Sequence, residues 1–378
     1  MKQLLTICCL IITVNSNAQN TAIPDANFEQ ALINLGYDSG PTNGSVPTAN
    51  IDTITSLSVN LSNISSLIGI EDFIALSSLD CWDNQLATLN ISQNLALTSL
   101  RCNNNLLTSI NVSQNLGLNV LWCTGNQLTS LDVTQNIALT VLLCMSNQIT
   151  SLDVSQNSNL IDLKCESNLL SSLDVTQNLN LVYLYCSNNP FVNMDISQNI
   201  NLLELSCSNT SISSLNVSQN TVLNTLVCQL NPQLTDVDVR NGNNTNFTYF
   251  STVISANLKC IYVDDKNGSY LSSWNKDATS YWVNDTIDCQ NISSINEFEI
   301  ENPFYIYPNP TTGIITIDLG ETKSNLNLSL INTLGQVILT ENYKTTDYIN
   351  LDLDAPKGVY FLRLETSGEV ITKKIIIE

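Results

Sequence analysis

Residues 97–115 read LTSLRCNNNLLTSINVSQN, and this stretch decides the fold. It holds two nested half-units, L-x-x-L-x-C-x-x-N and then L-x-x-I-x-V-x-x-N. Leu100 and Cys102 are two residues apart, so in an extended chain they share one face of a strand. The stretch therefore predicts a short strand with one apolar face in the first half-unit.

The same unit recurs with a period of 21 residues that never slips. A fixed period of about 20 to 50 residues indicates a stack of similar units, a solenoid. One coil buries too little apolar surface to offset the ordering of its residues, so neighbouring coils must cover each other and the ends need caps. Val59 precedes the first cysteine by 22 residues in a coil without cysteine, so we expect about nine coils. Eight cysteines carry the period: Cys81, Cys102, Cys123, Cys144, Cys165, Cys186, Cys207 and Cys228.

Both half-units carry the L-x-x-L-x-L-x-x-N signature and resemble the leucine-rich repeat. The nested 21-residue form is similar to a bacterial subclass in which a short second half, usually L-x-x-L-D-V, follows the asparagine. The resemblance covers roughly residues 54–241. It implies that the inward positions of a coil are those of Leu100, Cys102, Leu107, Ile110 and Val112. We therefore expect a mainly β fold, a leucine-rich repeat solenoid of about nine coils with an N-terminal helical cap, followed by a small C-terminal β-sandwich.

The start of the chain has the three parts of a secretory signal peptide. Lys2 precedes an apolar run at residues 4–14, and Ser16 and Ala18 are the small residues of a cleavage site. Cys8 and Cys9 raise the alternative of lipid attachment, but they lie inside the apolar run. No later stretch approaches 18 continuous apolar residues, so we expect no membrane span.

A capping helix is predicted between this segment and the repeats. Residues 23–38 read IPDANFEQALINLGYD and place Phe28, Ala31, Leu32 and Leu35 at helical spacing. The N-cap would be Asp25, and the helix would stop at Gly36.

The C-terminal segment carries four landmarks in order. From Phe304 the period is gone, and the chain reads IYPNPTTGIITIDL, then NTLGQVIL, GVYFLRLE and finally KKIIIE. These landmarks resemble the type A sorting domain of the type IX secretion system. The resemblance implies a small β-sandwich that carries the protein across the outer membrane of a Bacteroidetes-type bacterium, with the protein then released or held at the cell surface. The motif residues are Tyr307, Pro308, Asn309, Pro310, Gly313, Gly358, Tyr360, Lys373 and Lys374.

These patterns divide the chain into six parts. The division is a signal peptide (1–19), a helical cap (20–50), the solenoid (51–241), an irregular C-terminal cap (242–290), a linker (291–303) and the sorting domain (304–378).

Cysteine use differs between the repeats and the cap. In parallel coils, neighbouring cysteines would be about 4.8 Å apart, which is longer than a disulfide allows, so we expect buried free thiols that pack as small apolar groups. Cys260 and Cys289 lie in the irregular segment after the last coil. Because the chain is exported, we expect these two to form a disulfide that staples the cap.

Outward positions differ between the halves of the coil. The second half repeats Asn or Asp beside Ser or Thr, whereas the first half varies from coil to coil. Varied apolar and aromatic residues with a charged rim are typical of interfaces. The alternative is a sheet face without a ligand, partly covered by residues 247–282. The candidate binding face comprises Trp82, Arg101, Trp122, Val141, Leu143, Met145, Lys164, Glu166, Tyr183, Tyr185 and Glu204.

Four aspartates form a straight column in the second half: Asp132, Asp153, Asp174 and Asp195. At about 4.8 Å spacing their carboxylates should repel each other, which would raise some of their pKa values or recruit cations. Calcium is therefore the alternative to a protein without cofactors. No glycine-rich calcium loop accompanies the column, and residues 264–268 lack calcium-loop spacing and indicate a turn. We expect neither a metal site nor a cofactor.

Charge and composition exclude several functions. The formal net charge is −21, which disfavours nucleic acid and anionic membranes as partners. The chain has no histidine, so His-based catalytic triads are absent, and no paired-carboxylate or phosphate-loop motif is recognisable. A hydrolase would need a catalytic pair that the sequence does not reveal.

The favoured function is therefore non-enzymatic. We expect a secreted or cell-surface protein of a Gram-negative bacterium, exported by the type IX machinery, that binds an extracellular protein or polysaccharide as an adhesin or adaptor. The alternative is a structural scaffold of the cell surface without a specific ligand.

Overall fold

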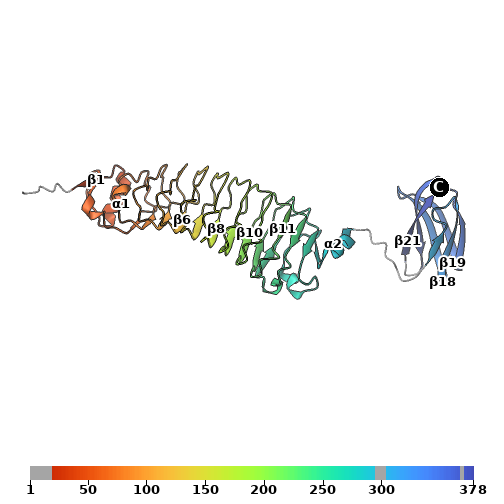
Figure 1. Ribbon diagram of the computed structural model, residues 1–378. Helices are drawn as coiled ribbons and strands as arrows, with labels where there is room; N and C mark the ends of the chain where they lie inside the picture. Colours follow the sequence, from red (N-terminus) through yellow and green to blue (C-terminus); the bar gives the residue numbers. More distant parts are fainter. Residues whose placement is uncertain (1–18, 294–303, 367–369) are drawn as a thin grey trace, which may run out of the picture. The chain divides into compact units, whose positions relative to one another are not determined.

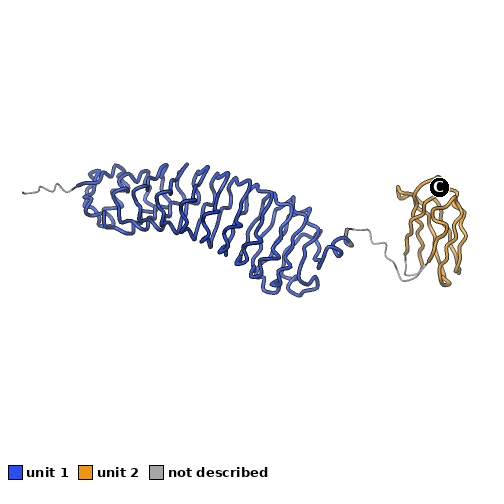
Figure 2. The backbone as a smooth tube through the Cα atoms, in the orientation of Figure 1, with its two compact units in different colours: residues 1–293 blue, residues 294–378 orange. Residues whose placement is uncertain are grey.

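The computed structural model describes residues 19–293, 304–366 and 370–378. The chain divides into two compact units, residues 1–293 and 294–378 (Figure 2). The expected signal peptide, apart from Gln19, and most of the expected linker lie outside the described residues.

The first unit is a solenoid built on one long parallel sheet (Figure 1). Within the described residues this sheet has ten strands, one more than the nine coils expected. The additional strand pairs Leu226 with Phe250, a step of 24 residues that the 21-residue period does not predict. The strands are β3 (Ser56–Ser58), β4 (Ser78–Asp80), β5 (Ser99–Arg101), β6 (Val120–Trp122), β7 (Val141–Leu143), β8 (Asp162–Lys164), β9 (Tyr183–Tyr185), β10 (Glu204–Ser206), β12 (Thr225–Val227) and β14 (Tyr249–Ser251).

Within the described residues, the second half of the coil forms strands only toward the C-terminal end of the solenoid. Four of them make a second parallel sheet in the order β11-β13-β15-β16. In the earlier coils the second half consists of irregular chain, bends and turns. The strands are β11 (Ser214–Asn216), β13 (Asp236–Asp238), β15 (Cys260–Tyr262) and β16 (Tyr281–Val283).

The core of the solenoid follows the repeat. Leu100, Cys102, Leu107 and Val112 are fully buried, as the resemblance implies, whereas Ile110 is only partly buried. The eight repeat cysteines are free and buried. Burial raises the pKa of the Cys102 thiol to about 12, so it stays protonated and packs as a small apolar group.

Two columns of buried asparagine join each coil to the one before it. The side-chain nitrogen of Asn126 donates to the carbonyls of Cys102 (3.1 Å) and Cys123 (3.0 Å), and its side-chain oxygen accepts from the Leu107 amide (3.0 Å). In the second column, Asn136 donates to the carbonyls of Val112 and Asn115. These side chains satisfy backbone groups that the coil corners leave without a secondary-structure partner.

The N-terminal cap contains the predicted helix, α1 (Ala26–Asn34). Asp25 caps it by accepting from the backbone amides of Asn27 and Phe28, and its other oxygen accepts from the amide of Ser65. The helix is thereby tied to the first coils. The cap is completed by β1 (Asn20–Ala22), β2 (Ser45–Pro47) and the short 3-10 helices η1 (Thr48–Asn50) and η2 (Ile70–Asp72).

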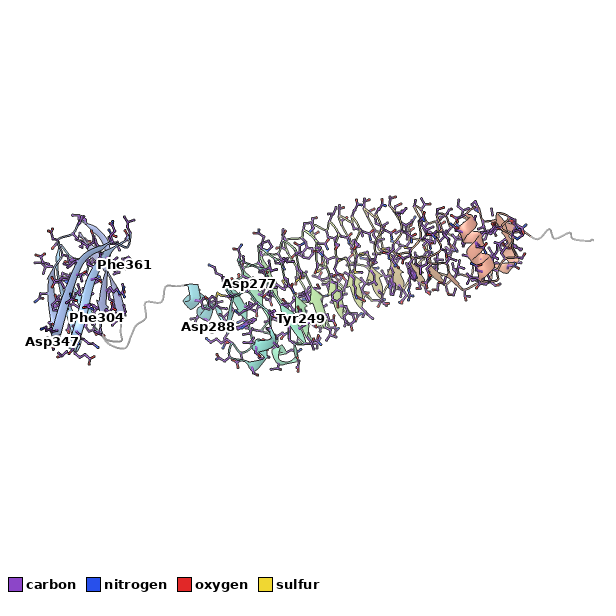
Figure 3. All side chains as sticks on the ribbon, turned by 180° about the vertical axis from the view of Figure 1, so that it is seen from behind. Tyr249, Asp277, Asp288, Phe304, Asp347 and Phe361 are labelled. Atoms are coloured by element: carbon purple, nitrogen blue, oxygen red, sulfur yellow. A yellow bond between two sulfur atoms is a disulfide. The ribbon has the colours of Figure 1, made fainter. Side chains whose placement is uncertain are left out.

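The C-terminal cap closes the solenoid with aromatic packing. Phe250 stacks on Trp274 with ring centroids 4.2 Å apart, and Trp282 meets both rings edge-on. Asp277 (Figure 3) accepts from the amides of Ile254 and Ser255, which fixes the turn after β14. The cap also contains η3 (Asn244–Asn246), η4 (Ser269–Ser273) and α2 (Thr286–Ser293).

The second unit is one continuous antiparallel sheet in the described residues. Its longest strand pairs with three others, and a register shift between Asp318 and Lys323 lets the sheet bend over its own apolar face. The expected sandwich is therefore made from a single sheet whose buried face includes Ile317, Leu328 and Leu362. The strands are β17 (Tyr305–Tyr307), β18 (Ile314–Asn332), β19 (Val337–Asp352), β20 (Gly358–Glu365) and β21 (Val370–Ile377).

Candidate recognition face

The strands of the main sheet position the candidate face. In each three-residue strand from β4 to β10 the middle leucine is buried and the two flanking residues point away from the core. The eleven predicted face residues, Trp82 among them, all lie in or beside strands β4 to β10 of this sheet. All are half-buried, because neighbouring strands about 4.8 Å apart cover the flanks of each other's side chains. We call this surface the strand face.

A cation and an aromatic ring pair at the first end of the strand face. The Arg101 guanidinium carbon lies 4.2 Å from the centroid of the Trp122 ring, and its Nε lies 3.8 Å from a carboxylate oxygen of Asp80. The three residues come from consecutive strands. A guanidinium held over an indole ring is a favourable arrangement that fixes both side chains.

Apolar side chains occupy the middle of the strand face. The sheet register places Trp122 beside Leu143 and Val120 beside Val141. Met145 follows Leu143 by two residues on the same coil. The expected apolar patch is therefore contiguous across β6 and β7, although half-buried.

A second polar cluster follows on β8, β9 and β10. The Lys164 ammonium lies 3.8 Å from an Asp162 carboxylate oxygen and 4.6 Å from the centroid of the Tyr185 ring. The Tyr185 hydroxyl donates to the carboxylate of Glu204. Burial, together with this hydrogen bond, raises the pKa of the Tyr185 hydroxyl.

This cluster holds more negative than positive charge. Burial raises the pKa values of the Asp162 and Glu166 carboxyls, and the Lys164 ammonium only partly offsets it. Asp80 and Asp162 were not among the expected face residues, yet each pairs with a cation that was. Their positions in the repeat could have identified them. Asp80 lies one residue and Asp162 three residues before the repeat cysteine of its coil, and both positions point outward from the strand.

The aspartate column behaves differently from the sequence expectation. The pKa values of Asp132, Asp153, Asp174 and Asp195 are lowered, not raised. In each case the main cause is a hydrogen bond from the backbone amide two residues later, as from Thr134 to Asp132 at 3.0 Å. This local bond outweighs repulsion between neighbouring coils. Within the described ranges, no group of three or more Cys, Asp or Glu side chains could hold a metal ion.

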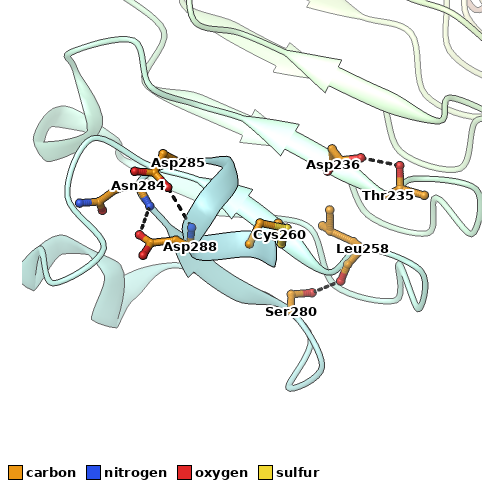
Figure 4. The surroundings of a disulfide bond; sticks show 9 residues. Thr235, Asp236, Leu258, Cys260, Ser280, Asn284, Asp285 and Asp288 are labelled. Atoms are coloured by element: carbon orange, nitrogen blue, oxygen red, sulfur yellow. Dashed lines mark hydrogen bonds between the residues drawn. A yellow bond between two sulfur atoms is a disulfide. The ribbon is translucent and has the colours of Figure 1, made fainter. Parts of the chain in front are cut away.

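The two cysteines of the C-terminal cap are joined in the structure. Cys260 on β15 and Cys289 on α2 form a disulfide with Cα atoms 5.9 Å apart (Figure 4). Beside it, the side chain of Asp288 accepts from the amide of Asn284, which helps to hold α2 against the last strand. Mass spectrometry of unreduced peptides should detect the linked pair, and two free thiols would contradict this prediction.

The sorting motifs meet around Asn309. Its side-chain nitrogen donates to the carbonyl of Lys374 (2.7 Å), and its oxygen accepts from the amide of Ile376 (2.9 Å). These hydrogen bonds join the first motif, Tyr307 to Pro310, to the last strand, although Asn309 and Lys374 are 65 residues apart in the sequence. Gly313 has a positive φ of 136°, which favours glycine, and its carbonyl accepts from the amide of Leu353.

The remaining motif residues lie in the same unit. The Tyr360 hydroxyl donates to the carbonyl of Pro356 (2.7 Å), which ties down the chain that enters β20 at Gly358. The Lys373 ammonium lies 5.5 Å from the ring centroid of Phe304 (Figure 3). All nine therefore belong to one small domain, and most of their contacts hold its ends together.

The family comparison decides the identity of this unit. Residues 305–378 match the family described as secretion system C-terminal sorting domain. This unit is a type IX secretion sorting domain. The sorting domain directs export, so the protein is secreted or placed at the surface of a Gram-negative cell, with the secretion machinery as a partner. No helix in the described part of the chain is long and apolar enough to cross a membrane.

Comparison with solved structures shows the fold of the solenoid. The functional domain of InlJ from Listeria monocytogenes, which includes a cysteine ladder, is 23% identical, covers 96% of this chain and 99% of its own, and has a TM-score of 0.53. The internalin InlF from the same organism is 16% identical, covers 68% of this chain and 96% of its own, and has a TM-score of 0.46. The solenoid is a leucine-rich repeat structure. No curated protein matches the chain significantly.

Proposed function

We propose that the exported solenoid is a non-enzymatic recognition module that binds an extracellular protein or polysaccharide through the strand face. The observation that carries this proposal is the contrast within each coil. Buried and turn positions repeat, whereas the outward positions of the main sheet change from coil to coil and gather aromatic, apolar and charged residues. Residues that repeat serve the stack, whereas residues that vary are free to contact a partner.

The fixed geometry of the strand face supports the same proposal. Arg101 is held over Trp122, and Lys164 is held over Tyr185. Side chains that are ordered before binding lose less conformational entropy when a partner docks. Aromatic and arginine side chains beside an apolar centre are typical of the residues that dominate binding energy.

The alternative function is a surface scaffold without a specific ligand. The monotonous second half of the coil favours it, since its aspartates bond to their own turns. A scaffold would keep its function after any strand-face substitution that leaves the protein folded and soluble. A recognition module would not.

The test is binding of the labelled chain to an array of glycans and surface proteins, with calcium and with chelator. The double variant Trp122→Asp, Met145→Asp places two charges in the apolar centre and should abolish binding. The matched control, Gln127→Asp, Gln148→Asp, adds the same charge on the same two coils at exposed positions outside the strand face. Equal binding by both variants would place the binding site outside the strand face, whereas no binding by the parent would favour the scaffold. Turnover of an array component would contradict the non-enzymatic part.

A further inference from the structure

A second surface lies on the turns that lead into the strands. It comprises seven segments, one from each of seven successive coils, which we call the neutral strip: residues 93–98, 114–119, 135–140, 156–161, 177–182, 198–203 and 219–224. No Asp, Glu, Lys or Arg occurs in any of these segments, although the chain carries a net charge of −21. The strip spans six coil-to-coil steps, about 29 Å at roughly 4.8 Å per step.

Large aliphatic side chains stand out along the middle of the neutral strip. They occupy the third position of five segments and are more exposed than any residue of the strand face. Large exposed apolar side chains gathered on one surface are typical of interaction sites. Their exposed fractions are Leu95 61%, Leu116 59%, Ile137 61%, Leu179 52% and Ile200 56%.

The four aliphatic side chains nearest Ser158 lie symmetrically about it, whereas the outermost pair of the column, Leu95 and Thr221, is not matched. Ile137 and Leu179 lie one coil before and after it, and Leu116 and Ile200 lie two coils away on either side. Large aliphatic residues at equal distances on both sides of a small central residue match a second copy turned end for end. Isologous dimers require this self-complementarity.

The fourth position of each segment adds a complementary size pattern. Before the centre it holds the small residues Gly117 and Ala138, and after the centre it holds Asn180 and Asn201. In an end-for-end pair centred on Ser158, each small residue of one copy faces an asparagine of the other. A small side chain opposite a larger one lets the two surfaces approach closely.

The asparagine side chains at these positions are held in place. Asn180 donates to the carbonyl of Ser158 (3.1 Å), and Asn201 donates to the carbonyl of Leu179 (3.1 Å). Together with Ala138 and Asn159 they line a shallow groove of about 650 Å³ along the strip. The groove is therefore a fixed feature of this surface.

We propose that the neutral strip is a dimer interface, in which two copies of the chain pack antiparallel across a two-fold axis at Ser158. A second copy can pack on the strip because the facing segments of the two chains carry no charged side chain. The length of the strip, about 29 Å, is similar to the diameter of a standard protein interface. Such an interface buries about 800 Å² on each partner, which corresponds to a patch about 28 Å across. The strand face contributes no residue to the strip.

Sedimentation equilibrium of the purified chain tests the interface. At about 100 μM the parent should be mostly dimer, because even a dissociation constant of about 10 μM leaves most of the chain associated. The variant Ile137→Glu, Leu179→Glu sets charges opposite each other and should weaken the dimer at least 100-fold. The control Leu106→Glu, Leu169→Glu adds the same charge at positions that are 47% and 54% exposed but outside the strip, and it should leave the dimer intact.

A crosslink tests the register. Ser158→Cys should form a disulfide-linked dimer under mild oxidation, because Ser158 faces its own copy at the axis. Thr221→Cys, at the end of the same column, should not. A parent that is monomeric up to about 100 μM, an equal loss of dimer in both glutamate variants, or crosslinking at Thr221→Cys alone would overturn the proposal. So would a monomeric parent that binds a neutral polysaccharide through Ile137 and Leu179, since the strip would then serve another partner.

Discussion

The two halves of the coil use carboxylates in opposite ways. In the second half, Asp174 accepts hydrogen bonds from the amide and hydroxyl of Thr176, and its pKa is lowered. In the first half, burial raises the pKa of Glu166, with Lys164 as its nearby cation. One carboxylate stabilises its own turn, whereas the other is held at a cost on the strand face. The repeated polar residues of the second half form hydrogen bonds that stabilise the coil. The varied polar residues of the first half remain available to contact a partner.

The largest effect should come from the two asparagine columns. Asn126→Ala removes the partner of the Leu107 amide and one of the two asparagine donors to each of the Cys102 and Cys123 carbonyls. It should lower the free energy of unfolding by about 4 kcal/mol, at roughly 1–3 kcal/mol for the orphaned amide and about 1 kcal/mol for each other lost hydrogen bond. Asn136→Ala removes two hydrogen bonds to carbonyls that each keep a backbone amide as a second donor, and should cost about 2 kcal/mol at roughly 1 kcal/mol for each bond. No amide is orphaned, since the Asn136 side-chain oxygen has no hydrogen-bond partner within the described chain. Urea unfolding of both variants measures the difference. A larger loss of unfolding free energy for Asn136→Ala than for Asn126→Ala would contradict this prediction.

A smaller effect is expected at the aspartate column. Asp174→Ala removes the acceptor of the Thr176 amide and should destabilise the solenoid by less than about 1 kcal/mol, because the group is exposed. The pKa of Asp174 lies below the ordinary 3.8, so its stabilisation is present above pH 3.8 and is lost as the pH falls through the lowered pKa. Thermal unfolding of parent and variant should therefore differ at pH 7 and converge in acid. A difference that grows below pH 3.8 would contradict the hydrogen-bond explanation.

The smallest effect is expected on the strand face, with the opposite sign. Glu166→Gln removes a half-buried charge and should stabilise the chain by roughly half a kcal/mol after solvent screening. The pKa of Glu166 is raised above the ordinary 4.5, so the penalty is present above the raised pKa and is relieved as the pH falls toward 4.5. Chemical unfolding at pH 7 and pH 4.5 should show the gain only at pH 7. A loss at pH 7 would mean that Glu166 serves the stack.

The repeat predicted most of the solenoid because one residue type marked each coil. It missed the strand that pairs Phe250 with Leu226, since that step lengthens to 24 residues without a cysteine. The predicted rise in the aspartate pKa values was wrong. The prediction considered repulsion between aspartates of neighbouring coils but not the hydrogen bond from the backbone amide two residues later, as from Thr134 to Asp132. The neutral strip was not predicted, because Ser158 and Thr221 interrupt its column of aliphatic residues.

The sorting domain shows a different limit. Its motifs could be recognised in order, but nothing in the sequence places Asn309 against the backbone of Lys374 and Ile376. Likewise, the composition of the strand face was predicted, whereas its half-burial and the pairing of Arg101 with Trp122 depend on sheet register. Such contacts across the sheet require the three-dimensional arrangement.

Carboxyl footprinting tests the central claim most directly. Carbodiimide labelling of the chain, alone and with the array component that binds it, is read out by mass spectrometry at four carboxylates. Binding through the strand face should protect Glu166 and Glu204 and leave Asp153 and Asp174 unchanged. Protection of Asp153 and Asp174 alone, or equal protection of all four, would contradict the assignment of recognition to the first half of the coil.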